Sequence, residues 1–524
     1  MAEAFRASLL GRFLAALAAM YQVSRLRRFN EAIGRSAKHS RVCRAVDRSL
    51  AAPMTATENA IPGRLSRRIN GLLARVRTLP RWWRGSALCR IYAFIMRVGR
   101  GSLLFGWLFA GGMTSFILLA LALYEPVNYV LRNIVGINIL ASLWDEALLA
   151  FSLCWIVRTR MTEGEPLPSR VNTLDVPLYT FLGVGLMLMF LVSPYFSIAV
   201  EGYRATVQYM LWFFVVTRLV RGDRDFKQMY MAMVLFAALI ALHGIYQYIV
   251  AVPIPSNWVD QAEQGVRTRV FSIFGSPNIM GDFMVMFAPM AAGMAYSCKD
   301  WKAKAFFWCC TFAMCLSCLF TMSRGAWVAM AVAVLVFALL HDRKLFLLVL
   351  AAGFVSLFIP FVASRIGYLF TEEFAASTTN GGRASRWALG LSYLSASPML
   401  GLGLGMFGGA VAVQHKVYSW MSYFYMDNYY LKILTEMGCV GFTFFILLMV
   451  SLVLVGLRAV YRSKKSDGGK TSPLCVGMFA GLCGVLVHCY FENIFEEPYM
   501  MAYFWIIAAL IVYLGFFRKP SEAK

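Results

Sequence analysis

The sequence predicts an all-α integral membrane protein, and three of its properties indicate this fold class. Its 524 residues are 60% hydrophobic and only 15% charged, with a mean hydropathy of +0.63. From residue 102 onward, apolar runs long enough to cross a bilayer as helices follow one another along the chain. Basic segments recur between these runs on one predicted side. This composition excludes an ordinary soluble enzyme.

The first hundred residues differ from the rest of the chain in charge. They hold 20 Lys or Arg residues and 4 acids, so +16 of the net charge of +23 lies there. Apolar residues recur at helical spacing between Phe5 and Met20, which indicates an amphipathic helix in the membrane plane. We therefore expect residues 1–100 to be a basic cytoplasmic extension that contacts membrane lipids. No nucleic-acid-binding motif accompanies the charge, so nucleic acid is not an expected partner.

Residues 101–524 are expected to form a polytopic membrane domain with about twelve transmembrane helices. The apolar runs lie at about 102–123, 137–157, 174–193, 197–220, 228–250, 278–298, 304–322, 325–341, 344–363, 428–457, 473–491 and 499–517. Segments such as "RGDRDFK" and "RAVYRSKKSDGGK" then lie on the basic, cytoplasmic side, with both termini. The outer face receives two long connections, 251–277 and 364–427, and loops of such length tend to be functional.

Nothing in the sequence indicates a metal or another cofactor. The five histidines, at positions 39, 243, 341, 415 and 488, are too scattered to predict a metal site. Most of the twelve cysteines fall in apolar runs or in the basic extension, where a small packing residue is the simplest interpretation.

Arginines gather on the predicted outer face. A guanidinium group binds phosphate oxygens bidentately and keeps its charge when it is partly desolvated. Arg269 and Arg324 lie beside small residues at the ends of two runs, an arrangement that can hold an anion near backbone N–H groups. The other outer arginines either contact the substrate or anchor the loops to lipid headgroups; they are Arg267, Arg383 and Arg386.

The stretch "MDNYYLKILTEMGCVGF" places charges at the start of a membrane run, where by default they mark a functional site or its support. Asp427 and Asn428 stand where a helix N-cap belongs. Lys432 and Glu436, four residues apart, are expected to pair and brace the helix.

Four motifs, in this order, resemble the O-antigen ligase and polymerase superfamily, the WaaL- and Wzy-type lipid-linked glycan transferases. They are "RVFSIFGSPNIMGD", "TMSRGAW", "GGRASRWALGLSYLSASPMLGLGLGMF" and an Asp-Asn pair followed by Gly438 and Gly441, with weaker support from "HGIYQY". The resemblance covers about residues 170–515. The family pattern at the end of the long loop is His-Asn, whereas this chain has Asp427 before Asn428, which is a departure from a strict ligase pattern.

The resemblance implies a GT-C-like fold and an inverting, metal-independent glycosyltransferase at the outer face of the bacterial inner membrane. It implies an undecaprenyl-diphosphate-linked glycan donor and a glycan or lipid acceptor. Asp427, Arg269 and Arg324 would carry catalysis, with Asp427 as a candidate base at the position of the family histidine and His415, in the same long loop, as a rival base. The expected substrate-binding residues are Arg267, Asn278, Arg383, Arg386, Asn428 and His415.

Several alternatives remain open at this point. The sequence does not separate a ligase, which transfers the glycan to another acceptor, from a polymerase, which extends a lipid-linked repeat. A membrane transporter shares the expected layout, although transporters place polar residues near the membrane midplane. A glycan-assembly protein without catalytic activity is the third alternative.

Overall fold

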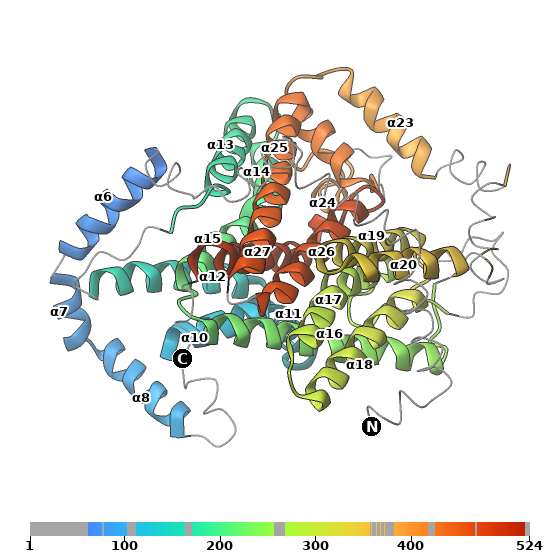
Figure 1. Cartoon of the computed structure of the whole chain (residues 1–524). Helices are drawn as coiled ribbons and strands as arrows, with labels where there is room; N and C mark the ends of the chain where they lie inside the picture. The colour runs from blue at the N-terminus through green and yellow to red at the C-terminus, as the bar shows by residue number, and fades with distance from the viewer. Residues whose placement is uncertain are drawn as a thin grey trace, which may run out of the picture. The chain divides into compact units, whose positions relative to one another are not determined.

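The computed structural model describes residues 61–75, 78–101, 112–162, 170–255, 268–356, 382–417, 425–466 and 469–518, with isolated positions between 358 and 372. The amphipathic helix predicted near the N-terminus lies outside the described residues. All regular structure in the described parts is helical, as the sequence predicts (Figure 1).

Three amphipathic helices precede the membrane runs. They are α6 (Ile61–Arg75), α7 (Thr78–Gly85) and α8 (Ala87–Gly101). In α6, Ile61, Leu65, Ile69 and Leu72 share one helical face, and each is exposed. Such an exposed apolar face, flanked by arginines, is typical of a helix that lies on a membrane surface. The role predicted for this extension remains a prediction.

The extension is attached to the first helices of the membrane domain. The guanidinium carbon of Arg158 lies 5.1 Å from the centre of the Trp83 ring and 4.3 Å from that of Trp155. Arg160 also donates a hydrogen bond to the side chain of Asn70. These contacts join α6 and α7 to one end of α12 (Asn138–Thr162).

The next helices of the membrane domain are short or bent. Helix α10 (Gly112–Ala122) is followed at a 73° bend by α11 (Tyr124–Tyr129) and η1 (Val130–Val135). After α12 come α13 (Asp175–Leu191), α14 (Phe196–Val207), η2 (Gln208–Met210) and α15 (Leu211–Leu219).

Six helices among the described residues are long and apolar enough to cross a membrane, and the bent α10–η1 pair would make seven. The six are α16 (Asp223–Ile249), α17 (Pro277–Ser297), α18 (Trp301–Phe320), α19 (Arg324–His341), α25 (Tyr429–Lys465) and α27 (Pro498–Val512) with η6 (Tyr513–Phe517). The other predicted runs contain helices that are shorter, broken or more polar, among them α20 (Arg343–Ser356) and α26 (Ser472–His488). The protein is therefore a multi-pass membrane protein, and the number twelve stays a prediction.

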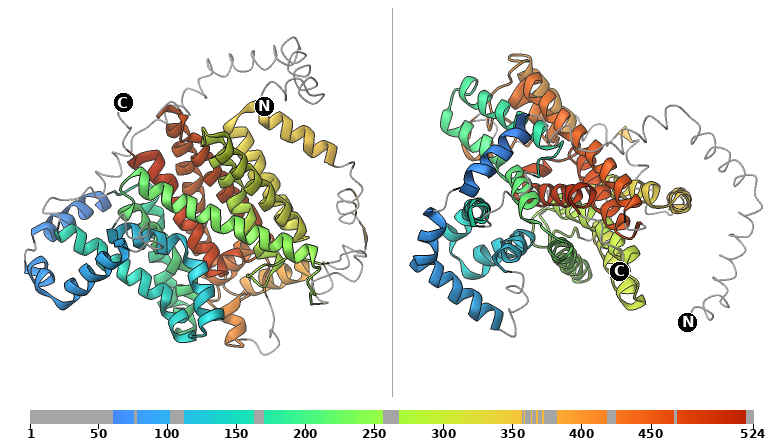
Figure 2. Two further views of the ribbon diagram at one scale, coloured as in Figure 1. Left: turned by 90° about the horizontal axis from the view of Figure 1, so that it is seen from below. Right: turned by 60° about the vertical axis from the view of Figure 1, so that its left-hand side comes forward.

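Helix α17 lies at the centre of the bundle, between α18, α19 and α26, as the views of Figures 1 and 2 show. Small residues allow α17 and α26 to approach closely. A Cβ atom on Gly481 would lie 2.2 Å from the carbonyl oxygen of Met286, and one on Gly477 would lie 2.4 Å from that of Pro289. These two glycines therefore hold the helices at backbone contact.

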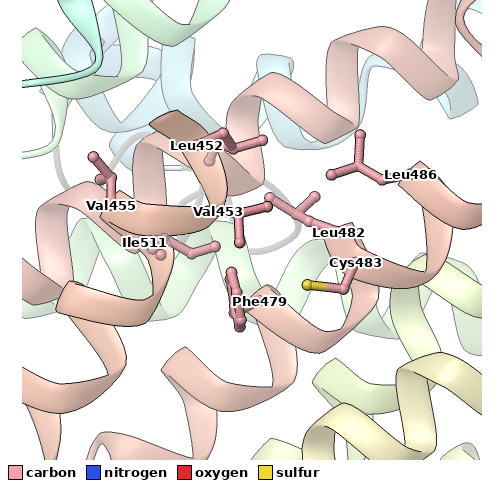
Figure 3. A pocket seen from close by; sticks show the side chains of 10 residues that line it. Leu452, Val453, Val455, Phe479, Leu482, Cys483, Leu486 and Ile511 are labelled. Atoms are coloured by element: carbon pink, nitrogen blue, oxygen red, sulfur yellow. The ribbon is translucent and has the colours of Figure 1, made fainter. Parts of the chain in front are cut away.

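Helices α25, α26 and α27 pack tightly against one another. A pocket of only about 10 Å³ remains there, and its lining, which includes Leu452, Phe479, Leu482 and Ile511, is apolar (Figure 3). A void of this size and character offers no polar partner to a ligand. This void is therefore not a candidate substrate site.

Ion pairs gather at one end of the bundle, which we call the clasp end. Asp175 at the start of α13 pairs with Arg218 at the end of α15 at 3.0 Å. Asp223 at the start of α16 pairs with Arg518 after η6 at 2.7 Å, and Arg518 also donates to Thr471 Oγ1 at 3.0 Å. The segments predicted to be cytoplasmic, such as "RGDRDFK", lie at this end. We call the opposite end, where α26 ends and α25 begins, the site end.

Candidate functional site

The segment before α25 is held in place by the long loop and by the end of α26. Met426 N donates to Gly408 O at 3.0 Å, and Tyr429 N donates to Cys489 O at 2.8 Å. Asn493 donates from Nδ2 to the same Gly408 oxygen at 2.8 Å. Its Oδ1 accepts from the backbone N–H of Asn428 at 3.2 Å. The backbone around position 427 is thus fixed on both sides.

Asn428 is the N-cap of α25, as the sequence predicts. Its Oδ1 accepts from the backbone N–H of Leu431 at 3.0 Å, which satisfies one of the free donors of the first turn. Asp427 does not share this role, contrary to the expectation that both residues cap the helix. Its backbone has φ +50°, a left-handed conformation that turns its side chain away from the helix start.

The Asp427 carboxylate faces two arginines of α23 (Arg383–Leu394) instead. Arg386 Nη1 lies 2.5 Å from Asp427 Oδ2, and Arg383 Nε lies 4.0 Å from the same oxygen. Burial raises the pKa of the Asp427 carboxyl, the nearby charge of Glu492 also raises it, and both arginines lower it; together these effects give a pKa of about 6. A carboxyl of this kind changes its charge close to neutral pH, as a general base requires.

Arg269 lies in a second chain of contacts. Its Nε donates to Thr321 O at 3.0 Å, and its Nη2 donates to Asn278 Oδ1 at 3.2 Å. Asn278 in turn donates from Nδ2 to Glu492 Oε2 at 2.5 Å. The two predicted site residues Arg269 and Asn278 are therefore brought together, and Glu492 completes the chain.

Arg324 is the first residue of α19, whose N-cap is Ser323, with Oγ accepting from Ala326 N at 3.4 Å. The turn packs on the end of α26. A Cβ atom on Gly325 would lie 2.8 Å from His488 Nε2 and 3.2 Å from Phe491 Cβ. Only glycine allows this approach, which places the start of α19 beside the residues that lead to Glu492.

Glu492 connects these groups, and the sequence analysis missed it. It accepts a hydrogen bond from Asn278. Burial is the main cause that raises the pKa values of Asp427 and Glu497, and the negative charge of Glu492 also raises both. The available signal was the acidic stretch "FENIFEEP" directly after the apolar run 473–491, on the predicted outer face. This stretch has three carboxylates in eight residues. Charged residues at the mouth of a membrane helix by default mark a functional site or its support.

Lys432 and Glu436 form a buried brace, as predicted. Lys432 Nζ lies 2.8 Å from Glu436 Oε2 and 3.3 Å from Glu496 Oε1. Glu436 also accepts from the backbone N–H of Phe407 at 3.1 Å, and Glu496 accepts from that of Ala410 at 3.2 Å. The three side chains thus tie α25 to the glycine-rich part of the long loop.

The same loop enters a break in α25. Gly438 has φ +63° and ψ −172°, so the helical hydrogen bonds stop there. Leu402 N and Gly403 N donate to the freed carbonyls of Thr435 and Glu436 at 3.0 and 2.9 Å. Beyond the break, Cys439 N donates to Pro398 O at 2.9 Å. The glycines of "GLGLG" therefore serve this close packing.

The remaining predicted site residues lie elsewhere. His415, at the end of α24 (Ala410–Gln414), lies with its Nε2 2.7 Å from Glu201 Oε2 on α14. Arg267 lies outside the described residues. The predicted roles of all these residues in substrate binding and catalysis stay predictions.

The helices and this polar end define a class: a multi-pass, all-helical membrane protein with charged side chains concentrated where two helices and a long loop meet. The family model described as O-antigen ligase matches residues 309–446, from α18 to the first part of α25. The match supports the O-antigen ligase and polymerase superfamily. It includes Arg324, the α23 arginines and Asp427, whereas Arg269 and Asn278 precede it. No curated protein matches the chain in sequence.

Proposed function

We propose that the protein is a membrane glycosyltransferase that transfers or polymerises an undecaprenyl-diphosphate-linked glycan at the outer face of the bacterial inner membrane. One observation carries this proposal. A carboxyl with a raised pKa and a set of arginines meet at one end of the bundle, partly within the segment that matches O-antigen ligases. Perturbed titratable groups beside fixed cations are typical of catalytic sites.

The proposed reaction forms one glycosidic bond and breaks one sugar–phosphate bond. The acceptor hydroxyl oxygen attacks the anomeric carbon and loses its proton to Asp427, while the diphosphate leaves as an anion on its lipid. Attack opposite the leaving group inverts the anomeric configuration. Arg269 and Arg324 stabilise the charge that develops on the diphosphate, which is the largest kind of contribution in such a site. The arginines thus supply the positive charge that the departing anion needs.

The remaining side chains position these groups. Arg386 and Arg383 hold the Asp427 carboxylate, and Asn278 together with Glu492 orients Arg269. Asn428 and the Lys432 brace fix the helix start on which Asp427 is mounted. Precise placement of reacting groups accounts for a large part of enzymatic rate enhancement.

The two rival functions have less support. A transporter needs polar residues that line a path through the membrane midplane. In the described parts of α17 and α27, the spans most enclosed by protein, nearly all side chains are apolar, with Asp282 as the charged exception in α17. A scaffold without catalytic activity has no need of a carboxyl that titrates near neutral pH. Both alternatives predict no glycan transfer by the purified protein.

The test is transfer by the purified full-length protein in lipid nanodiscs, with an undecaprenyl-diphosphate-linked oligosaccharide as donor. Release of undecaprenyl diphosphate is measured with lipid A-core or with a second lipid-linked repeat as acceptor, which separates a ligase from a polymerase. Arg269→Lys and Arg324→Lys replace a bidentate group by a point charge, so turnover should fall about 100-fold in each. Absence of transfer to either acceptor from a donor that binds would reject the proposed function.

A further inference from the structure

A second polar space lies at the site end, beside the Asp427 group. This acidic cavity has a volume of about 620 Å³ and lies between α11, α12, α14, α24 and the segment Glu496–Tyr499. The volume falls in the range of roughly 300–1,000 Å³ that is usual for small-molecule sites. Of the side chains that line it, the mechanism above uses Glu496 alone, through its ion pair with Lys432.

The lining combines carboxylates, amides and tyrosines. Asp145, Glu201, Glu496 and Glu497 are its acids, and Arg132 and Arg204 are its bases. One of these bases, Arg204, forms an ion pair with Glu146 outside the lining, which reduces its effect in the cavity. The cavity is therefore acidic, in contrast to the arginine-rich surroundings of Asp427.

Its inner wall is a hydrogen-bonded network. Tyr209 donates to Asp145 Oδ2 at 2.5 Å, and Gln208 Nε2 donates to the same oxygen at 2.9 Å. The hydroxyl of Tyr124 lies 3.3 Å from that of Tyr209, and Arg204 Nε donates to Gln208 Oε1 at 2.8 Å. Polar groups fixed in this way keep their directions before a ligand arrives, which lowers the entropic cost of binding.

We propose that this acidic cavity binds sugar residues of the glycan substrate that carry no negative charge, namely neutral or amino sugars. A sugar presents hydroxyl groups in many directions, which match carboxylate and amide partners, and apolar C–H faces, which match tyrosine rings. An acyl or prenyl chain would displace water from these polar groups without replacing its hydrogen bonds, and that loss is costly. Phosphate and uronic acid groups would be repelled by the acids.

The position of the cavity fits a glycan that extends from the transfer site. The wall segment Glu496–Tyr499 borders both spaces: Glu496 pairs with Lys432 of α25, and the charge of Glu492 raises the pKa of both Glu497 and Asp427. The ring of Tyr499 stacks on Phe274, in the segment that carries Arg269 and Asn278, at 4.9 Å between centroids. This inference rests on the proposed function, because only a glycan substrate needs a sugar site here.

His415 acquires a role in this arrangement. Its contact with Glu201 at 2.7 Å joins α24, one wall of the cavity, to α14, the opposite wall. It holds the rim together, and in this proposal it is a positioning residue.

The experiment measures sugar binding by the full-length protein in detergent, with saturation-transfer difference NMR and without a transfer reaction. The probes are a neutral N-acetylglucosamine disaccharide, its amino form and a glucuronic acid disaccharide. We expect signals from the first two and none from the third. Equal signals from all three probes would overturn the proposal, as would a protein that binds only divalent cations in the cavity.

A filled cavity provides the matched comparison. Ala205 is exposed and lines the cavity from α14, so Ala205→Trp should lower sugar affinity at least tenfold. Val200, on the same helix, is 40% exposed and is not part of the lining, so Val200→Trp should bind sugars like the wild type. Thermal unfolding of both variants shows that they are folded, and the smaller Ala205→Phe replaces Ala205→Trp if the latter unfolds. Unchanged binding in a folded cavity-filling variant would contradict the proposal.

Kinetics then identify the source of the sugar. In the transfer assay, a KM that rises in Ala205→Trp for the donor alone assigns the cavity to the donor glycan, and a rise for the acceptor alone assigns it to the acceptor. Unchanged KM values for both substrates in an active enzyme would reject the cavity while the proposed function stands. Sugar binding that the filled cavity abolishes, in a protein that transfers nothing, would reject the proposed function alone.

Discussion

The two ends of the helix bundle use the same kinds of charged residues in opposite ways. At the clasp end, each carboxylate that holds the helices together has a close guanidinium partner, Asp175 with Arg218 and Asp223 with Arg518. At the site end, acids also lie close to one another: burial and the charge of Glu492 raise the pKa of both Asp427 and Glu497, and the pKa of Asp427 is about 6. One end is arranged for stability, and the other holds charge that a ligand can use.

The comparison teaches where to look for function in such a protein. Paired charges at helix ends are common and contribute modestly to stability. Carboxyl groups that lie close together in a partly buried place are costly, and such costs persist mainly where they serve a function. A residue at the site end should therefore affect turnover, whereas its counterpart at the clasp end should affect only stability.

The largest effect is expected from Asp427→Asn. Asparagine keeps the shape and tolerates the left-handed backbone at this position, but it accepts no proton. Turnover in the transfer assay should fall by about 10²–10⁴-fold, the range for loss of a general base, with little change in thermal unfolding. The matched control is Asp223→Asn at the clasp end, which should leave turnover per folded molecule unchanged.

Arg386→Gln tests whether Asp427 acts as a base or only anchors α23 to the start of α25. It breaks the 2.5 Å contact but leaves the carboxylate in place. If Asp427 only anchors α23, then Arg386→Gln and Asp427→Asn would reduce turnover equally, and the base assignment would be wrong.

The next largest effect should follow from Lys432→Met. Methionine fills a similar volume but leaves Glu436 and Glu496 buried without their shared cation. Loss of one partner from a buried ion pair typically costs about 3–5 kcal/mol, so the free energy of unfolding should decrease by that order. Chemical unfolding in detergent measures it, and a loss below about 1 kcal/mol would place this brace with ordinary surface pairs.

A smaller effect is expected from pH. Because the pKa of Asp427 is raised from 3.8 to about 6, its carboxyl is protonated at low pH and cannot act as a base. Turnover should rise with pH and level off above about 6, and the pH–rate profile of the purified protein measures this. The folded state holds this proton more tightly than the unfolded chain, so the stability from this group declines as pH rises from 3.8 to about 6. An equally steep acid limb in Asp427→Asn would assign the titration to another group.

The smallest effect is expected at the clasp end itself. Arg518→Gln removes the partner of Asp223, whose side chain is 38% exposed. Partly exposed pairs contribute at most about 1 kcal/mol, so the melting temperature should fall only slightly and turnover should stay unchanged. A large loss of turnover in this variant would contradict the division of labour between the two ends.

The sequence predicted the features that follow from periodicity and from local chemistry. Apolar runs predicted the helices, and the position of Asn428 predicted the N-cap that the structure contains. The four-residue spacing of Lys432 and Glu436 predicted their contact. Each of these depends on residues that are near one another along the chain.

Features that depend on distant residues could not be predicted in this way. Glu492 meets Asn278 across more than two hundred residues, and Glu201 meets His415 across a similar separation. The acidic cavity takes its walls from five separate segments, so no single stretch of sequence contains its signal. The count of about twelve spans was uncertain for another reason, since short, bent helices such as α10 and α11 satisfy hydropathy without a straight crossing.

The break at Gly438 has a consequence for motion. Since the carbonyls of Thr435 and Glu436 bond to the loop rather than along the helix, the first turns of α25 are mechanically part of the loop. The loop also accepts hydrogen bonds from Cys439 N and Val440 N beyond the break, through the carbonyls of Pro398 and Met399, so it is bonded to both parts of α25. The loop therefore bridges the break at this glycine and restricts movement of the first turns of α25 relative to the rest of the helix.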